Sequence, residues 1–183
     1  MVVDSVIFDH NKQINIICGQ SIPNSKITNN IFSNNECKQS VETGQSSIIF
    51  FNATKNLEST TTAVLERNTF MRNSSEHVFT STIKSLALIN NTIVTNETKR
   101  LFYVDGTNLE LYNNTIIGNS VGETVIELIG APLNMVGNIM VGNVDPSGKN
   151  TERIWSNKRW KTYSTQAIWK RCWCWASKWS WCW

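Results

Sequence analysis

The sequence predicts an all-β chain that winds into a right-handed parallel β-helix, a solenoid of about six coils of 23–24 residues, because one nine-residue pattern recurs along it. The pattern is clearest as Leu111-Tyr-Asn-Asn-Thr-Ile-Ile-Gly-Asn119. It starts near residues 3, 27, 65, 88, 111 and 135. Three observations favour this class: two apolar columns, two asparagine columns, and short β-branched runs between them.

The apolar columns predict the core. When each repeat is numbered from its first apolar residue, positions 1 and 6 are apolar in all six repeats. Position 1 is Val3, Ile27, Leu65, Leu88, Leu111 and Met135, and position 6 is Phe8, Phe32, Phe70, Ile93, Ile116 and Met140. Equal positions of successive coils stack about 4.8 Å apart in a parallel β-helix, so we expect a solenoid roughly 29 Å long with two interior ladders.

The asparagine columns predict the bends. Position 4 is asparagine in five repeats, and position 9 is asparagine in all six. These residues are Asn30, Asn68, Asn91, Asn114 and Asn138 at position 4, and Asn11, Asn35, Asn73, Asn96, Asn119 and Asn143 at position 9. Position 4 lies between two strands, where the chain must turn, and asparagine tolerates the left-handed backbone region. We therefore expect it to make the bend and its amide to hydrogen-bond to the asparagines above and below.

A third strand per coil is predicted from runs such as Ile48–Phe51 and Leu101–Val104. Between position 9 and this run lies a variable polar segment, for example Ser74–Glu76 and Ser120–Glu123. Variable polar segments at one place in each coil are typical of loops on one flank. Those loops are where a protein or glycan partner is expected to bind.

The domain organisation is predicted as a β-helix over residues 1–148 and a tail over 149–183. The step from Ile27 to Leu65 is 38 residues, so the sequence predicts an insertion within 36–62, divided between Glu36–Ser46 and the Thr-rich stretch 52–62. Insertions in solenoids form surface loops, which either bind partners or have no role.

The tail breaks the repeat. It holds all eight tryptophans and Cys172, Cys174 and Cys182, whose spacing is weak evidence for a metal site. Three interpretations remain open: a cap on the open end of the solenoid, a cationic Trp-rich segment that contacts a membrane surface, or a frameshifted end. The third is suggested by the Trp and Cys codons, which read one base later encode Ala and Gly, as in a low-complexity linker.

Charge and hydropathy exclude several classes of function. Residues 1–150 carry 13 acidic and 10 basic residues, so no basic surface for nucleic acid is predicted. No run of 18 apolar residues is present, so no transmembrane helix is expected. The first 20 residues lack the pattern of a signal peptide, which suggests that the natural chain is longer.

The sequence predicts no catalytic, cofactor-binding or metal-binding residues. Enzymes with this fold need paired carboxylates or a carboxylate cluster beside a base. The pairs Asp9–His10 and Lys99–Arg100 are expected to be solvated, and His77 to be structural. An enzyme is indicated instead if three carboxylates meet Lys99 or Arg100 in one cleft, the candidates being Asp4, Asp9, Asp105, Glu110, Glu123 and Glu127.

Five Asn-x-Ser/Thr sequons occur at Asn52, Asn73, Asn90, Asn96 and Asn113. Such sequons are glycosylation candidates in secreted eukaryotic proteins. Four of the five fall at or beside the asparagine columns, so the repeat by itself accounts for them.

The segments Phe8-Asp-His-Asn11, Phe32-Ser-Asn-Asn35 and Phe70-Met-Arg-Asn73 form an FxxN repeat. This repeat resembles that of polymorphic outer membrane proteins and, more broadly, the β-helix passengers of autotransporter adhesins. The resemblance implies an extracellular or cell-surface chain, part of a longer protein, that acts as a non-enzymatic stalk or adhesin. Two alternatives remain: a fragment of a carbohydrate-active β-helix enzyme without a recognisable site, and a truncated open reading frame without independent function.

Overall fold

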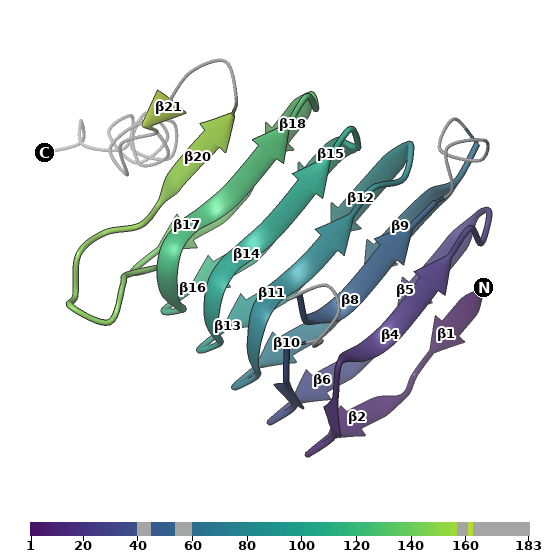
Figure 1. The fold of residues 1–183 in the computed structure, drawn as a ribbon, viewed down its shortest axis with the longest axis horizontal. Helices are drawn as coiled ribbons and strands as arrows, with labels where there is room; N and C mark the ends of the chain where they lie inside the picture. The colour runs from purple at the N-terminus through teal and green to yellow at the C-terminus, as the bar shows by residue number, and fades with distance from the viewer. Residues whose placement is uncertain (40–44, 54–59, 157–160, 163–183) are drawn as a thin grey trace, which may run out of the picture.

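The chain is a parallel β-solenoid. A computed structural model describes residues 1–39, 45–53, 60–156 and 161–162, and these residues form strands and turns without any helix. Three sheets run side by side along the long axis of the molecule (Figure 1). The all-β, parallel solenoid predicted from the repeat is therefore confirmed.

Sheets A and B contain the repeated pattern, and each has six strands. Sheet A carries position 1 and consists of β1 (Val2–Asp4), β5 (Ser25–Thr28), β9 (Thr62–Glu66), β12 (Ser85–Ile89), β15 (Asn108–Tyr112) and β18 (Leu133–Val136). Sheet B carries position 6 and consists of β2 (Ile7–Asp9), β6 (Ile31–Ser33), β10 (Thr69–Met71), β13 (Thr92–Val94), β16 (Thr115–Ile117) and β19 (Ile139–Val141). Six strands in each sheet are separated by five steps, so the solenoid makes about five complete turns.

Sheet C closes each coil. Its strands are β3 (Lys12–Gln13), β4 (Asn15–Gln20), β7 (Glu36–Cys37), β8 (Ser47–Asn52), β11 (Ser74–Ser81), β14 (Glu97–Asp105), β17 (Ser120–Ile129), β20 (Arg153–Ser156) and β21 (Lys161–Thr162). All its pairs are parallel except the last, β20 with β21. Short turns from sheet C back to sheet A, such as residues 82–84, complete the coils.

The core consists of stacked equal positions, as the two apolar columns predict. In sheet A, Leu65, Leu88 and Leu111 lie directly above one another and are buried. In sheet B, the rings of Phe32 and Phe70 stack nearly parallel with centroids 4.7 Å apart, which is the spacing of adjacent strands. Sheet C adds a third interior column, which includes Ile17, Ile49, Phe79, Phe102 and Ile126.

The asparagine side chains form two continuous hydrogen-bonded ladders. Asn91 Oδ1 accepts hydrogen bonds from the backbone N–H (2.9 Å) and the side-chain Nδ2 (3.0 Å) of Asn68. Asn91 Nδ2 donates in turn to Asn114 Oδ1 (3.0 Å) and to the backbone carbonyl of Leu65 (2.9 Å). The position-9 column repeats the arrangement around Asn96. The predicted stacking of amides is confirmed, and each amide satisfies buried backbone groups of neighbouring coils.

The left-handed residue at each bend is not the ladder asparagine. Positive φ angles occur one residue earlier, at positions 3 and 8, for example at Arg67 (55°), Asn90 (56°) and Gly137 (70°). The prediction that the position-4 asparagine adopts this conformation is therefore wrong. The bend residue faces solvent and varies in type, so it leaves no column in the sequence, whereas the asparagine that follows is held by its hydrogen bonds.

The polar segments after position 9 are strands rather than the loops that the sequence predicts. Ser74 pairs with Glu97, and Glu97 pairs with Ser120, at the starts of β11, β14 and β17. These residues resemble a loop in sequence because the outer face of the sheet is solvated. Their backbone groups are nevertheless paired between coils, so a partner-binding flank of loops does not exist at these places.

The second coil contains two additions. Glu36 and Ser47 are 11 residues apart but pair with Ser74 and His77, which are 3 apart. Phe51 and Thr62 are also 11 apart but align with Ser81 and Ser85, which are 4 apart. These additions account for the 38-residue step, and both lie between strands. Residues 40–44 and 54–59, within these additions, lie outside the described residues.

Parallel pairing continues past residue 148, the end of the β-helix expected from the sequence. In β20, Ile154 is buried and pairs with Ile126 of β17. The Glu152 side chain, also buried, accepts hydrogen bonds from the backbone N–H (3.3 Å) and Nδ2 (3.5 Å) of Asn143. Glu152 thus ends the position-9 ladder where a further asparagine would stand. Residues 157–160 and 163–183, with the three late cysteines, lie outside the described residues.

Replacing Asn91 by alanine should lower the free energy of unfolding by about 3–5 kcal/mol, because it leaves buried donors and acceptors of three neighbours without partners. Urea denaturation of the full chain measures this loss. The matched control is Asn90→Gly, which keeps the left-handed bend and should cost about 1 kcal/mol or less. Equal losses for the two variants would show that the ladder contributes no special stability.

Replacing Glu152 by alanine should destabilise the chain by about 1–2 kcal/mol, because the Asn143 backbone N–H then lacks its acceptor. Glu152→Gln retains an acceptor oxygen and should stay within about 0.5 kcal/mol of the parent. The comparison is made by urea denaturation at neutral pH. If Glu152→Gln is as unstable as Glu152→Ala, the carboxylate has a role other than accepting from Asn143.

Candidate functional site

Charged side chains gather on the outer face of sheet C, across β11, β14 and β17. The group, which we name the sheet C cluster, consists of Glu76, Lys99, Arg100, Glu123 and Glu127. Glu76, Lys99 and Glu123 follow one another at steps of 23 and 24 residues, so successive coils bring them together. It is the densest set of acidic and basic groups among the described residues, and it is the first candidate for chemistry.

Ion pairs link the cluster from coil to coil. The Arg100 guanidinium contacts the carboxylates of both Glu123 and Glu127. Lys99 Nζ lies 3.3 Å from Glu123 Oε1 and 3.7 Å from Glu76 Oε1. Arg100 and Glu127 are largely buried, with side chains 15% exposed. Charges of opposite sign therefore alternate along the axis, an arrangement that holds three coils together.

His77 lies beside the cluster and is almost fully buried, at 1% exposure. Its Nε2 accepts a hydrogen bond from Arg100 Nη1 (3.3 Å), so the proton is on Nδ1, which faces Thr80 Oγ1 at 3.2 Å. The Thr80 hydroxyl is 2.7 Å from that of Ser47. Burial, followed by the charges of Arg100 and Lys99, lowers the pKa of His77 to about 3. The imidazole is thus a neutral link in a hydrogen-bonded chain.

Two of the six carboxylates considered from the sequence, Glu123 and Glu127, meet Arg100 and Lys99 here. The condition set for an enzyme requires three of the six, so it is not met. The third carboxylate is Glu76, which the sequence argument did not consider. Its place in the column with Lys99 and Glu123 was the signal that could have found it. Glu76 Oε2 is buried and has no hydrogen-bond partner among the described residues.

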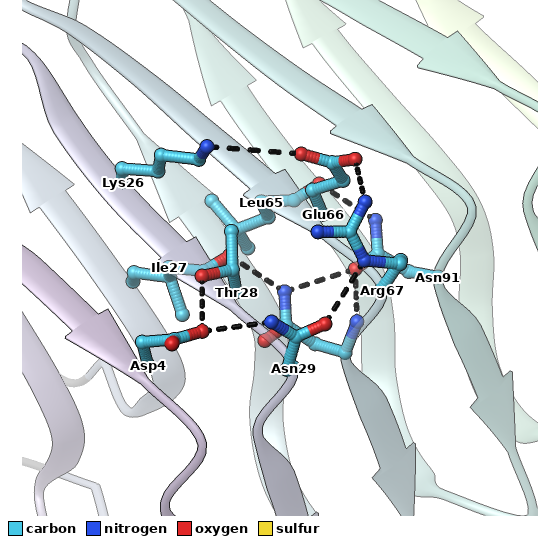
Figure 2. Close-up of polar contacts among 10 residues, drawn as sticks. Asp4, Lys26, Ile27, Thr28, Asn29, Leu65, Glu66, Arg67 and Asn91 are labelled. Carbon is cyan, nitrogen blue, oxygen red and sulfur yellow. Dashed lines mark hydrogen bonds and ion pairs between the residues drawn. The ribbon is translucent and has the colours of Figure 1, made fainter.

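Asp4 belongs to a different network, at the bend between sheets A and B (Figure 2). Its Oδ1 accepts hydrogen bonds from Thr28 Oγ1 (2.6 Å) and Asn29 Nδ2 (2.8 Å). Asn29 Oδ1 accepts from Arg67 Nε (2.9 Å), and Arg67 pairs with Glu66. The hydrogen bonds from Thr28 and Asn29 lower the pKa of Asp4. The network fastens the first three coils to one another.

Asp9 repeats this arrangement at the next bend. Its Oδ1 accepts from Ser33 Oγ (2.6 Å) and Asn34 Nδ2 (2.8 Å), while Oδ2 contacts His10 Nδ1 (2.7 Å). These hydrogen bonds lower the pKa of Asp9, with Ser33 the largest cause. The Ser33 hydroxyl donates to the carboxylate and not to the imidazole. The three side chains therefore do not form the serine–histidine pair of a hydrolase.

The remaining candidates are dispersed. Asp105 lines a shallow pocket with Asn52, Thr82, Ile83, Lys84 and Gly106, where sheet C turns back to sheet A. Glu110 lies on the outer face of sheet A. Among the described residues, no group of three His, Cys, Asp or Glu side chains is arranged to hold a metal ion.

The sequons divide by burial. Asn73 and Asn96 are buried members of the position-9 ladder, whereas Asn90 and Asn113 are exposed at the bends. Asn52 is half-buried and accepts a hydrogen bond from Thr82. Cys18 and Cys37 are free thiols, and in the described ranges no helix has the length and apolar character needed to cross a membrane.

No protein-family model matches the chain, and neither a curated protein nor a solved structure matches it. The functional argument therefore depends on the geometry of the molecule itself.

Replacing His77 by glutamine should flatten the pH dependence of stability between pH 6.5 and about 3. The unfolded chain binds a proton on His77 in this window while the folded chain does not, so stability is complete above pH 6.5 and falls as the pH decreases. Urea midpoints measured across the window give the slope. His10→Gln, at the exposed histidine, is the matched control and should keep the parental slope; an unchanged slope in His77→Gln contradicts the assignment.

Proposed function

We propose that the chain is a rigid segment of a secreted or cell-surface β-solenoid, which serves as a stalk or adhesin and binds a protein or glycan partner without transforming it. The observation that carries this proposal is the pair of asparagine ladders, which continue from the first coil to the last. They fix the register of every coil, so outward side chains form a regular array at the spacing of the strands. The FxxN resemblance supports the surface location.

The outer faces of the sheets, rather than loops after position 9, are the places where this protein would meet a partner. The polar segments in question are paired strands, and their side chains stand on solvated faces. Binding groups on strands are held more precisely than groups on loops, because neighbouring strands restrict their backbone. A pre-organised surface loses little conformational entropy on binding.

A carbohydrate-active enzyme is the second candidate, and the sheet C cluster is the observation that favours it. Three carboxylates there lie beside Lys99 and Arg100. Acid–base catalysis requires a carboxylate that reaches the substrate with its proton free to move. Glu123 and Glu127 are both paired with Arg100, which holds them in the charged form. The arrangement therefore supports cohesion between coils better than proton transfer.

The full-length chain should bind a glycan array or cell surfaces saturably and leave the ligand chemically intact. Fluorescent labelling measures the binding, and mass spectrometry of the incubated glycans detects products. Shortened or unsaturated oligosaccharides that disappear with Glu127→Gln would establish the enzyme and overturn the proposal. An absence of binding to every glycan and cell tested would also contradict it.

A further inference from the structure

We propose that a neutral polysaccharide chain binds the outer face of sheet A around Tyr112, an inference that rests on the adhesin function proposed above. The surface, which we name the Tyr112 patch, extends over β12, β15 and β18, which lie next to one another in Figure 1. It consists of Ile89, Asn108, Glu110, Tyr112, Asn134 and Val136.

Strand alternation places these side chains on one face. In β15, Leu109 and Leu111 are buried, while Asn108, Glu110 and Tyr112 between them point outward. The parallel register then aligns Tyr112 with Ile89 on one side and with Val136 on the other. Glu110 is aligned with Asn134 in the same way. The patch therefore has an apolar row beside a polar row, both along the solenoid axis.

Hydrogen bonds orient the polar row before any ligand arrives. Asn108 Nδ2 donates to Glu110 Oε1 (2.8 Å), and Asn134 Nδ2 donates to the Tyr112 hydroxyl oxygen (2.7 Å). These contacts leave Glu110 Oε2 and Asn134 Oδ1 as acceptors and the Tyr112 O–H as a donor, with no further hydrogen bond to a described residue. Acceptors and a donor at fixed separations suit the hydroxyl groups of a sugar.

The apolar row suits the other surface of a sugar ring. A pyranose exposes C–H groups on its faces and hydroxyl groups at its edges. The ring of Tyr112, flanked by Ile89 and by Val136 (56% exposed), provides an uncharged platform for the C–H groups. Tyrosine is effective at such places because its body is apolar and its end is polar. A sugar can therefore contact both rows at the same time.

Charge and size select the class of ligand. Glu110 is the single ionisable acid or base of the patch, so its negative charge disfavours acidic glycans and leaves neutral ones. Three strands about 4.8 Å apart and five residues long cover on the order of 150 Å². A stable protein interface needs roughly 800 Å² on each partner. The patch is thus too small for a folded protein or a second copy of the chain, but it matches a narrow polymer.

The outer face of sheet B offers a contrast within the same molecule. Its central strands β10, β13 and β16 present Thr69, Thr92 and Thr115 with the aliphatic side chains Met71, Val94 and Ile117. This face has no aromatic ring, amide or carboxylate among these residues. A substitution there leaves the Tyr112 patch unchanged and serves as a control.

The test uses the full-length chain and titrates it with hexasaccharides of β-linked glucose, N-acetylglucosamine, xylose and mannose, and with oligogalacturonate as the acidic probe. Isothermal titration calorimetry measures the affinity. At least one neutral probe should bind. Tyr112→Ala and Glu110→Gln should each weaken it about tenfold or more, equivalent to about 1.4 kcal/mol. Tyr112→Phe should retain part of the affinity, and Thr92→Ala all of it. Circular dichroism establishes that each variant is folded.

The outcomes separate the two proposals. Binding of a neutral probe that Tyr112→Ala and Glu110→Gln leave unchanged overturns the patch but keeps the adhesin. Binding of oligogalacturonate alone overturns the choice of neutral glycans. If the parent chain binds no probe here and no glycan or cell in the broader assay, both proposals fail.

Discussion

A buried asparagine amide that hydrogen-bonds along the axis is the interaction on which the rest of the solenoid depends. Each bend would otherwise bury a backbone N–H and a carbonyl without partners, at a cost of about 1–3 kcal/mol for each group. Asn91 satisfies such groups on Asn68 and Leu65, and Asn96 does the same one bend later. At the last coil the acceptor is Glu152, a different residue with the same role. The ladders therefore set the coil length and restrict additional residues to the connections between strands.

This constraint separates structure from recognition. Inward side chains stack in columns and are nearly interchangeable from coil to coil, since only their size and apolar character matter. Outward side chains are free to differ, and the ladders hold them in a regular array. The bend residues illustrate the division: Arg67, Asn90 and Gly137 share a left-handed conformation although their side chains have nothing in common.

The two polar surfaces differ in how far their groups are already satisfied. In the sheet C cluster, Arg100 is engaged by two carboxylates and by His77, so its charge is used within the molecule. In the Tyr112 patch, two internal hydrogen bonds orient the side chains and leave other donors and acceptors free. A ligand gains more from groups that are oriented but unsatisfied, because no internal bond must be broken first.

The sequence by itself determined the solenoid, its register, the two apolar ladders and the stacked asparagines, because these features repeat at a fixed period and each must recur to be satisfied. It misplaced the left-handed residue and took the starts of β11 and β14 for loops, because solvated positions are not constrained to one residue type. Only the tertiary structure showed that Glu76 joins Lys99 and Glu123, that Glu152 ends a ladder, and that Tyr112 lies beside Asn134. Such contacts join residues of different coils that share no motif, and only the register of the folded coils brings them together.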